Sequence, residues 1–243
     1  MRKLYLHLTT FMLLAAFFLT PSMSQVSKAQ HLYPTFKKVS VKANAQGMAN
    51  ADIEYIRISN ASGSSQLTKI DNMNRKSVFT DDVLAIGDQA AAKKLAAELI
   101  DCYYDGMWEL PYIETRQEVT VVRGGKYVVY LTNYIGYYGG ATASCGSTAE
   151  CYNLHTGTKV NLDYLATGAW RSPLKRTLWN KCKERVQLQC TYDEMNIPTN
   201  CVITEFGIKF LFGQGELSCN ADGVVEIELS DDELKALGID IRW

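Results

Sequence analysis

Residues 116–140 read RQEVTVVRGGKYVVYLTNYIGYYGG, two runs rich in β-branched and aromatic residues that flank the pair Gly124-Gly125. Adjacent glycines between two such runs are a strong signal for a β-hairpin. In the second run, Tyr130, Tyr134 and Tyr138 fall on one face of a strand, because side chains alternate with a period of two. The sequence therefore predicts a hairpin that carries a row of tyrosines on one side of a sheet.

Three segments elsewhere carry helix signals. Residues 88–106 are rich in alanine, begin with a capping aspartate and end in glycine. Ser172 as N-cap and Pro173 at the first helical position predict a second helix. Ser230 and Glu233 match a capping box, which predicts the start of a third helix near the C-terminus.

Strand patterns surround these helices in groups. Residues 51–59, 206–213 and 224–229 have strand-like patterns, and residues 38–43 predict a first strand. Strict alternation of single strands with helices is absent. We therefore expect an α+β fold with a mainly antiparallel sheet and two or three helices packed on one of its faces.

The first 24 residues have the layout of a secretory signal peptide. Arg2 and Lys3 precede an apolar block at 11–19, and small residues lead to an expected cleavage after Ser24, with Ala29 as second choice. The block is too short to span a bilayer, and no later segment approaches the roughly 20 apolar residues that a membrane helix needs. We therefore expect a secreted or periplasmic protein without a membrane span.

This layout divides the chain into a signal peptide (1–24), an N-terminal strand-helix region (25–115) and a C-terminal α+β domain (116–243). The last two are also compatible with one composite domain.

Cleavage after residue 24 changes the formal charge from -1 to about -3, with no block of like charge, so nothing favours nucleic acid as a partner. The mature chain, at about 219 residues, is long enough to bury a real core without disulfides.

Cysteine is nevertheless frequent, and all seven cysteines follow the signal peptide, at positions 102, 145, 151, 182, 190, 201 and 219. Thiols in an oxidising compartment tend to pair, and three bridges with one cysteine left over allow about 105 arrangements. The five residues between Cys145 and Cys151 suit a disulfide-clasped loop between paired strands, with Gly146 easing the turn. We therefore predict a disulfide between Cys145 and Cys151.

Metal binding and nucleophilic catalysis find little support. The mature chain holds only His31 and His155, so a histidine cluster is excluded, and we predict no metal and no cofactor. Cys145 with His155 is a conceivable catalytic pair, but the predicted disulfide competes for the same thiol. No residue is therefore assigned a catalytic role.

Two hydrolase patterns have simpler structural explanations. Ser172 and Lys175 match S-x-x-K, yet the partner motifs S-D-N and K-T-G are missing, and Ser172 is explained as a helix cap. Asp231, Asp232 and Glu233 form the densest carboxylate cluster, but they lie in the first turn of a predicted helix, where the helix dipole stabilises negative charge. An enzyme is the less favoured interpretation.

Aromatic side chains offer a better basis for binding. Rings with a polar tip suit sugars or protein partners, because they bury a large area at modest entropic cost. The alternative is that many of these rings line an ordinary core between a sheet and its helices. We assign the candidate ligand site to the end of the tyrosine strand and the residues after it, namely Tyr130, Tyr134, Tyr138, Gly139, Gly140 and Thr142.

Three segments occur in the order found in a known family: YVVYLTNYIGYYGGATAS (127–144), YNLHTGTKVNLDYL (152–165) and FGIKFLFGQGELSCNADGVVEIELSDDEL (206–234). They resemble exported domains of unassigned function. Those domains form the extracytoplasmic part of lysozyme-sensing anti-sigma factors and accompany polysaccharide deacetylase domains in bacterial cell-wall enzymes. The matching positions are Gly139, Gly140, Ala141, Tyr152, Leu154, Thr156, Gly157, Leu162, Asp163, Leu165, Phe210, Phe212, Glu216, Ala221, Gly223, Glu226 and Ile227.

The resemblance covers residues 116–237 and implies a small sheet with helices packed against it. Thr142 stands where the family pattern has a histidine, so any chemistry of that histidine is missing from this chain. The implied role is an exported recognition module of the bacterial envelope. Its partner would be an envelope glycan, peptidoglycan or a lysozyme-like protein. A cell-envelope hydrolase and a purely structural accessory domain are the alternatives.

Overall fold

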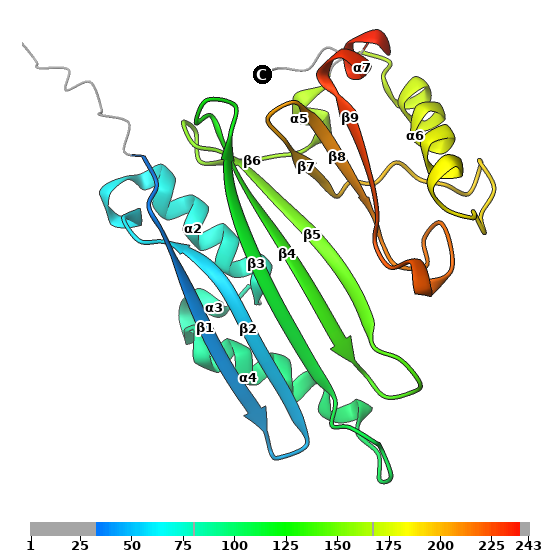
Figure 1. Cartoon of the computed structure of the whole chain (residues 1–243). Helices are drawn as coiled ribbons and strands as arrows, with labels where there is room; N and C mark the ends of the chain where they lie inside the picture. The colour runs from blue at the N-terminus through cyan, green and yellow to red at the C-terminus, as the bar shows by residue number, and fades with distance from the viewer. Residues whose placement is uncertain (1–32, 80, 167, 239–243) are drawn as a thin grey trace, which may run out of the picture. The chain divides into compact units, whose positions relative to one another are not determined.

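Two β-sheets organise the chain in the computed structural model, which describes residues 33–79, 81–166 and 168–238 (Figure 1). The larger sheet has the strand order β1-β2-β3-β4-β5-β6, and the smaller has the order β7-β8-β9. All neighbouring strands are antiparallel except β2 and β3, which are parallel. The predicted α+β fold with a mainly antiparallel sheet is confirmed. The predicted signal peptide lies outside the described residues.

The strands are β1 (Phe36–Ala45), β2 (Ala49–Ile58), β3 (Tyr112–Val122), β4 (Tyr127–Tyr137), β5 (Ser144–Asn153), β6 (Thr158–Val160), β7 (Cys201–Ile203), β8 (Gly207–Phe212) and β9 (Val225–Ser230). The helices are α2 (Ser65–Val78), α3 (Val83–Ile86), α4 (Asp88–Glu98), α5 (Leu162–Leu165), α6 (Arg171–Arg185) and α7 (Asp231–Ala236). Short 3-10 turns lie at η1 (Ala61–Gly63), η2 (Ile100–Cys102) and η3 (Asn220–Asp222). The described residues belong to one compact unit, and the boundary placed after residue 115 falls inside β3.

Two tight turns make the long hairpins of the larger sheet. Gln46 and Gly47 have φ of 55° and 76° between β1 and β2, and Gly124 and Gly125 have 61° and 90° between β3 and β4. Two central residues with positive φ define a type I′ turn, whose twist matches that of the strands it joins. The hairpin predicted at Gly124-Gly125 is confirmed.

The parallel pair β2 and β3 is joined by a helical crossover. Parallel neighbours need a long connection, because the chain must return to the same end of the sheet. Here α2, α3, α4 and η2 make that connection, and α2 and α4 lie on one face of the sheet (Figure 1). Two apolar clusters fill this layer, one under α4 and β1-β2, and one under α2 and β2-β4-β5.

Helix α2 was not predicted from the sequence. Ser64 caps it by accepting a hydrogen bond from the Leu67 backbone N–H at 3.4 Å. Its buried face follows the helical spacing of three to four, but two of the five buried positions carry polar side chains. Those positions are Asp71 and Asn74, among the apolar Leu67, Ile70 and Val78. The buried face of α2 is therefore continuous in the structure, but in the sequence its apolar pattern is interrupted by these two polar residues.

Each buried polar group on α2 is paired with a group on the sheet. The Asp71 carboxylate, 3% exposed, accepts from Arg57 Nη2 at 2.6 Å and from the Ile58 backbone N–H at 2.8 Å. The Asn74 amide donates to the Ile56 carbonyl at 2.8 Å and accepts from the Gln117 amide at 2.9 Å. Satisfied polar groups of this kind fix the position of a helix on its sheet.

The opposite face of the larger sheet is covered, along β4 and β5, by the three-stranded sheet, and a third apolar cluster joins these strands to α6. Two loop side chains also cover the free edge of β5. Asn200 accepts from the Ala149 N–H at 2.7 Å and donates to the Ser147 carbonyl at 2.6 Å, and Gln214 accepts from the Cys145 N–H at 2.8 Å. An uncovered strand edge can pair with the edge of another chain, and side chains bound to it prevent that pairing.

The segment expected to form a stapled loop is instead strand β5. Cys145 and Cys151 both belong to it, and six positions of extended chain span about 20 Å. A disulfide needs Cα atoms within about 7 Å of one another. Cys145 and Cys151 cannot meet while both lie in β5, so the predicted Cys145–Cys151 disulfide is wrong. Their even spacing places both side chains on the face that looks toward the three-stranded sheet.

The three predicted helices are present, but the bounds and caps of two of them differ from those predicted. Leu174, Leu178 and Cys182 are the buried residues of α6, but the helix begins at Arg171 and Ser172 makes no side-chain cap. The capping box of Ser230 and Glu233 is present at the start of α7. Helix α4 ends at Glu98, well before Gly106, and its N-cap is Gly87 rather than Asp88.

Candidate functional site

The loop between β4 and β5 brings five of the six predicted ligand-site residues together. Strand β4 ends at Tyr137, and the chain bends through the two glycines before β5 begins at Ser144. Tyr138 is 42% exposed, and Gly140 is also exposed. The residues of this group are Tyr134, Tyr138, Gly139, Gly140 and Thr142.

Both glycines of this loop occupy conformations that favour glycine. Gly139 has φ of 89°, and a Cβ atom there would lie 3.4 Å from the side chains of Tyr104 and Met107. Gly140 has φ of 105°, and its carbonyl accepts a hydrogen bond from the Tyr137 hydroxyl at 3.0 Å. The bend therefore packs directly against the loop that follows α4 and η2.

Two tyrosine rings occupy the space beside glycines near this loop. A Cβ atom on Gly136 would meet the ring of Tyr138 at 2.7 Å, and one on Gly146 would meet the ring of Tyr134. Burial raises the pKa of the Tyr138 hydroxyl, and the neighbouring Tyr134 contributes to the same shift. The ring positions thus depend on the absence of side chains at 136 and 146.

Tyr130, the sixth predicted residue, belongs to the core and not to this surface. Its side chain is fully buried against Phe36 and Tyr152, with ring centroids at 6.5 Å and 6.1 Å. Its hydroxyl has no hydrogen-bond partner among the described residues. Burial, followed by the charge of Asp71, raises the pKa of Tyr130. Its assignment to a ligand site is therefore not supported, and the core alternative holds for this ring.

Replacing Tyr130 by phenylalanine is expected to keep or raise the free energy of unfolding at neutral pH, by up to about 1 kcal/mol, since a buried unpaired hydroxyl is unfavourable. The raised pKa means that the folded protein holds this proton more tightly than the unfolded chain. Stability is therefore lost as pH rises above about 10, and the variant should lose less of it. Urea unfolding at pH 7 and pH 11 measures both effects. A variant clearly less stable at both values would contradict the assignment, and Tyr164→Phe, at an exposed ring, is the control.

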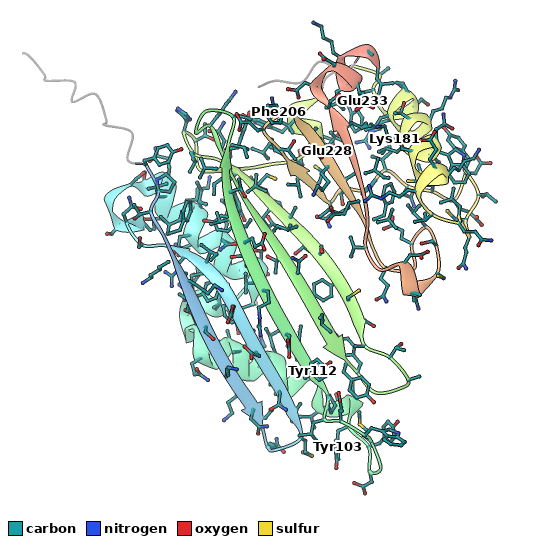
Figure 2. The ribbon with its side chains drawn as sticks, viewed as in Figure 1. Tyr103, Tyr112, Lys181, Phe206, Glu228 and Glu233 are labelled. Atoms are coloured by element: carbon teal, nitrogen blue, oxygen red, sulfur yellow. The ribbon has the colours of Figure 1, made fainter. Side chains whose placement is uncertain are left out.

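Exposed apolar side chains gather at this end of the larger sheet. Half of the large apolar residues that are exposed in the described part of the chain lie here, and Trp108 is 97% exposed. Figure 2 shows Tyr103 and Tyr112 at this end, remote from Lys181 and Glu233. Exposed apolar patches of this kind mark binding surfaces. We call this region the aromatic end and define it as the exposed Tyr104, Trp108, Leu110, Ile135 and Tyr138, the half-buried Tyr103 and Tyr112, and the buried Tyr137 beneath them.

A depression of about 530 Å³ adjoins the aromatic end on the face of the sheet opposite to the helices. Strand pairing aligns its polar side chains, because Asn44 pairs with Asn50, Asn50 with Tyr112, and Asp52 with Glu114. Sequence reasoning missed this site, although the alternating polar positions of β1, β2 and β3 were visible. It is lined by Lys42, Ala43, Asn44, Asn50, Ala51, Asp52, Tyr112, Ile113 and Glu114.

Charges in this depression are paired in a fixed network. Lys42 Nζ lies 2.7 Å from the Asp52 carboxylate, and Arg116 Nη1 lies 3.4 Å from it. The hydrogen bond from Lys42, assisted by the charge of Arg116, lowers the pKa of Asp52 against the opposing effect of burial. Asn44 donates to Asn50 at 2.9 Å. The walls therefore present both donors and acceptors at neutral pH.

Tyr112 links the depression to the predicted loop. Its ring stacks on that of Tyr137, with centroids 6.1 Å apart and planes at 27°. The Tyr137 hydroxyl in turn donates to the carbonyl of Gly140. The buried Tyr137 therefore connects Tyr112, in the wall of the depression, to the glycine bend.

Two other depressions lack this combination. One of about 330 Å³ lies between the sheets, where Glu118, Thr120 and Leu131 face Val202 and Lys209. Another, of about 660 Å³, lies along α2 and is lined mainly by serine, threonine and lysine. Neither includes an aromatic side chain, so the aromatic end is the better candidate for ligand binding.

The arrangements considered for catalysis are not assembled. Cys145 and His155 lie near opposite ends of β5, roughly 30 Å apart along the strand, so they form no dyad. Ser172 is exposed, and Lys175 is directed elsewhere, donating to the Asp193 carbonyl at 3.3 Å and lying over the ring of Tyr192.

The carboxylates at the start of α7 have structural partners. Asp231 forms a two-point ion pair with Arg123, at 2.5 and 2.7 Å, which ties the β3-β4 turn to the smaller sheet. Glu233 closes the capping box and pairs with Lys181 at 2.7 Å. Within the described ranges, no group of three or more His, Cys, Asp or Glu side chains could hold a metal ion. No helix of the same ranges is long and apolar enough to cross a membrane.

Comparison with known proteins identifies the fold and little beyond it. No family model and no curated protein matches the chain. A DUF3298 family member from Bacteroides fragilis, solved by crystallography, is similar, with a TM-score of 0.67 and 19% identity over 86% of this chain and 94% of that one. A DUF3298 family protein from Pseudomonas aeruginosa is similar with a TM-score of 0.61 and 10% identity, over the same shares of both chains. These neighbours are consistent with a domain of unknown function.

Proposed function

We propose that the protein is an exported binding module of the bacterial envelope that recognises glycan at the aromatic end of its larger sheet. The exported state follows from the signal peptide expected at residues 1–24. The envelope role follows from the sequence resemblance to exported recognition domains. The aromatic end, with the adjoining depression, supplies the site.

The observation that carries the proposal is the placement of Tyr112. Its ring lines a depression whose other walls bear amide, carboxylate and ammonium groups. A sugar ring has an apolar face of C–H groups and an equatorial rim of hydroxyls. The C–H face can pack on an aromatic ring, and the hydroxyl rim can form hydrogen bonds with fixed donors and acceptors, such as Asn44 and Asp52.

Peptidoglycan is the envelope glycan that we expect as ligand. Its sugars carry acetamido and carboxyl groups, which the mixed donors and acceptors of the depression can satisfy. Lys42 and Arg116 offer positive charge beside Asp52 and Glu114. A lysozyme-like protein is the competing ligand, and it would use the exposed Trp108 more than the depression.

Replacing Tyr112 by alanine is expected to weaken binding to peptidoglycan at least tenfold, equivalent to about 1.4 kcal/mol. The measurement is co-sedimentation of the chain lacking residues 1–24 with insoluble peptidoglycan, in parallel with capture on immobilised lysozyme. Tyr112→Phe keeps the ring and should retain most of the binding.

Tyr164→Ala is the matched control, because Tyr164 is 43% exposed on α5, beside the smaller sheet (Figure 1). Equal loss in both variants would contradict the placement of the site. Absence of peptidoglycan binding by the well-folded parent protein would contradict the proposed ligand. Capture by lysozyme alone, lost on Trp108→Ala, would move the proposal to a protein partner.

A further inference from the structure

The seven cysteines, all free thiols in the structure, are not scattered at random over the fold. Cys145 and Cys151 lie six positions apart on β5, so both side chains leave the same face of the sheet. That face carries the three-stranded sheet and its loops, where further cysteines lie.

Cys151 meets Cys201. Strand β7 lies against β5, and the Cys151 Sγ atom is 3.5 Å from the carbonyl oxygen of Cys201. Both residues are buried in the same apolar cluster, at 2% and 6% exposure. The two cysteines are therefore neighbours in one apolar cluster, as a disulfide between them requires.

Cys145 meets the loop that carries Cys219. Its backbone N–H donates to Gln214, whose amide donates at 2.9 Å to the carbonyl of Asn220, the residue after Cys219. A Cβ atom on Gly223 would lie 3.9 Å from the Cys145 sulfur. The Cys219 thiol contacts Asp222 at 3.5 Å, on the same short turn.

Cys182 and Cys190 form the third neighbouring pair. Cys182 is buried near the end of α6, and Cys190 packs against the same cluster as the chain returns from the helix. The turn between them begins where the Val186 N–H donates to the Cys182 carbonyl at 3.0 Å. After burial, the proximity of Cys190 is the next cause that raises the pKa of Cys182.

Cys102 is the cysteine that remains. It lies in η2 beside the aromatic end, where its carbonyl oxygen would be 3.5 Å from a Cβ atom on Gly139. We propose, on the basis of the exported state proposed above, that the protein carries three disulfides, Cys151–Cys201, Cys145–Cys219 and Cys182–Cys190, with Cys102 as a free thiol. Two of these bridges join β5 to the three-stranded sheet and its loops, and the third closes the turn after α6.

Each bridge forms by loss of two protons and two electrons from a pair of thiols, with one S–S bond made and two S–H bonds broken. A disulfide-bearing oxidant accepts the electrons by thiol-disulfide exchange, so that its own S–S bond becomes two thiols. Burial raises the pKa of Cys151 to about 12, which suppresses the reactive thiolate in the folded protein. The Cys151–Cys201 bridge therefore forms while the chain is still folding.

Peptide mapping without reduction tests the proposal. The chain lacking residues 1–24 is refolded in a buffer of reduced and oxidised glutathione, and its folded state is verified by circular dichroism. Acid quenching is followed by alkylation in guanidinium, so that buried free thiols are also labelled. Protease digestion and mass spectrometry should find the three linked peptides, each lighter by two hydrogen atoms than its free parts, and Cys102 alkylated.

Three variants make the outcome specific. Cys102→Ser should leave all three linked peptides at the parent yield. Cys219→Ser should remove one linked peptide and leave Cys145 alkylated, with the other two pairs intact, and Cys201→Ser should do the same for Cys151. A different dominant pairing, or complete alkylation of Cys151 and Cys201 in the folded parent, would overturn the proposal.

Discussion

Replacing Asp71 by alanine is expected to lower the free energy of unfolding by about 3–5 kcal/mol. The Asp71 carboxylate is buried under α2 and makes four contacts with β2, three to the Arg57 guanidinium and one to the Ile58 N–H. Its removal leaves Arg57, which is 24% exposed, beside the apolar cluster without its closest counter-ion. A buried charge without its partner is among the most destabilising defects in a folded protein.

Chemical unfolding followed by circular dichroism measures this effect. The matched control is Asp163→Ala, which also deletes an aspartate paired with an arginine, but both side chains of that pair are 65% exposed. We expect the control to change the free energy of unfolding by less than about 1 kcal/mol. Similar losses in the two variants would show that Asp71 does not hold α2 on the sheet.

Replacing Gly207 by alanine is expected to lower the free energy of unfolding by about 3 kcal/mol, the upper end of the range for added core volume. Gly207 opens β8 and pairs with Ser230 of β9. A Cβ atom there would collide with the carbonyl oxygen of Leu229 and come within 2.9 Å of the Ser230 Cα atom. Because both are backbone atoms, only a shift of β9 away from β8 relieves the collision.

Gly213, at the other end of β8, provides the control. A Cβ atom on Gly213 would have only the Glu216 carboxylate nearby, at 3.5 Å, which is ordinary contact. Gly213→Ala should therefore change stability by no more than about 1 kcal/mol. If Gly207→Ala proves equally mild, the close approach of β8 and β9 is looser than the structure shows.

Signals that act within one turn were sufficient to predict several elements. The glycine pair at 124–125 predicted a hairpin because a tight turn is specified by its own two residues. The capping box of Ser230 and Glu233 and the proline in the first turn of α6 were likewise local. Each depends on residues a few positions apart, and none needs knowledge of the rest of the fold.

Elements made by distant contacts were missed. Two buried positions of helix α2 are the polar residues Asp71 and Asn74. Their hydrogen-bond partners lie on the sheet and cannot be found from the local sequence. Strand β5 begins with small polar residues and is held by pairing with β4 and by Asn200 and Gln214. The same limit explains the wrong disulfide, because a loop was assumed where the neighbouring strand imposes an extended chain.

The candidate site divides in the same way. The loop residues Tyr138, Gly139 and Gly140 were predicted because the aromatic and glycine residues are adjacent in the sequence. The depression beside Tyr112 was missed, since it exists only in the parallel register that places Asn50 against Tyr112. Tyr130 and Tyr134 lie on the same face of β4. Helix α2 covers the part of that face that carries Tyr130, but not the part that carries Tyr134.

The parallel seam between β2 and β3 also has a kinetic consequence. Each flanking hairpin closes through a short turn, whereas the seam pairs strands that are separated by residues 59–111, so a long loop must close before it forms. Until then β2 presents an unpaired edge and the side chains of Ile53 and Tyr55 without their cover. Because these contacts join residues far apart in the sequence, we expect refolding from denaturant to be slower than for a chain of the same length built only of local hairpins.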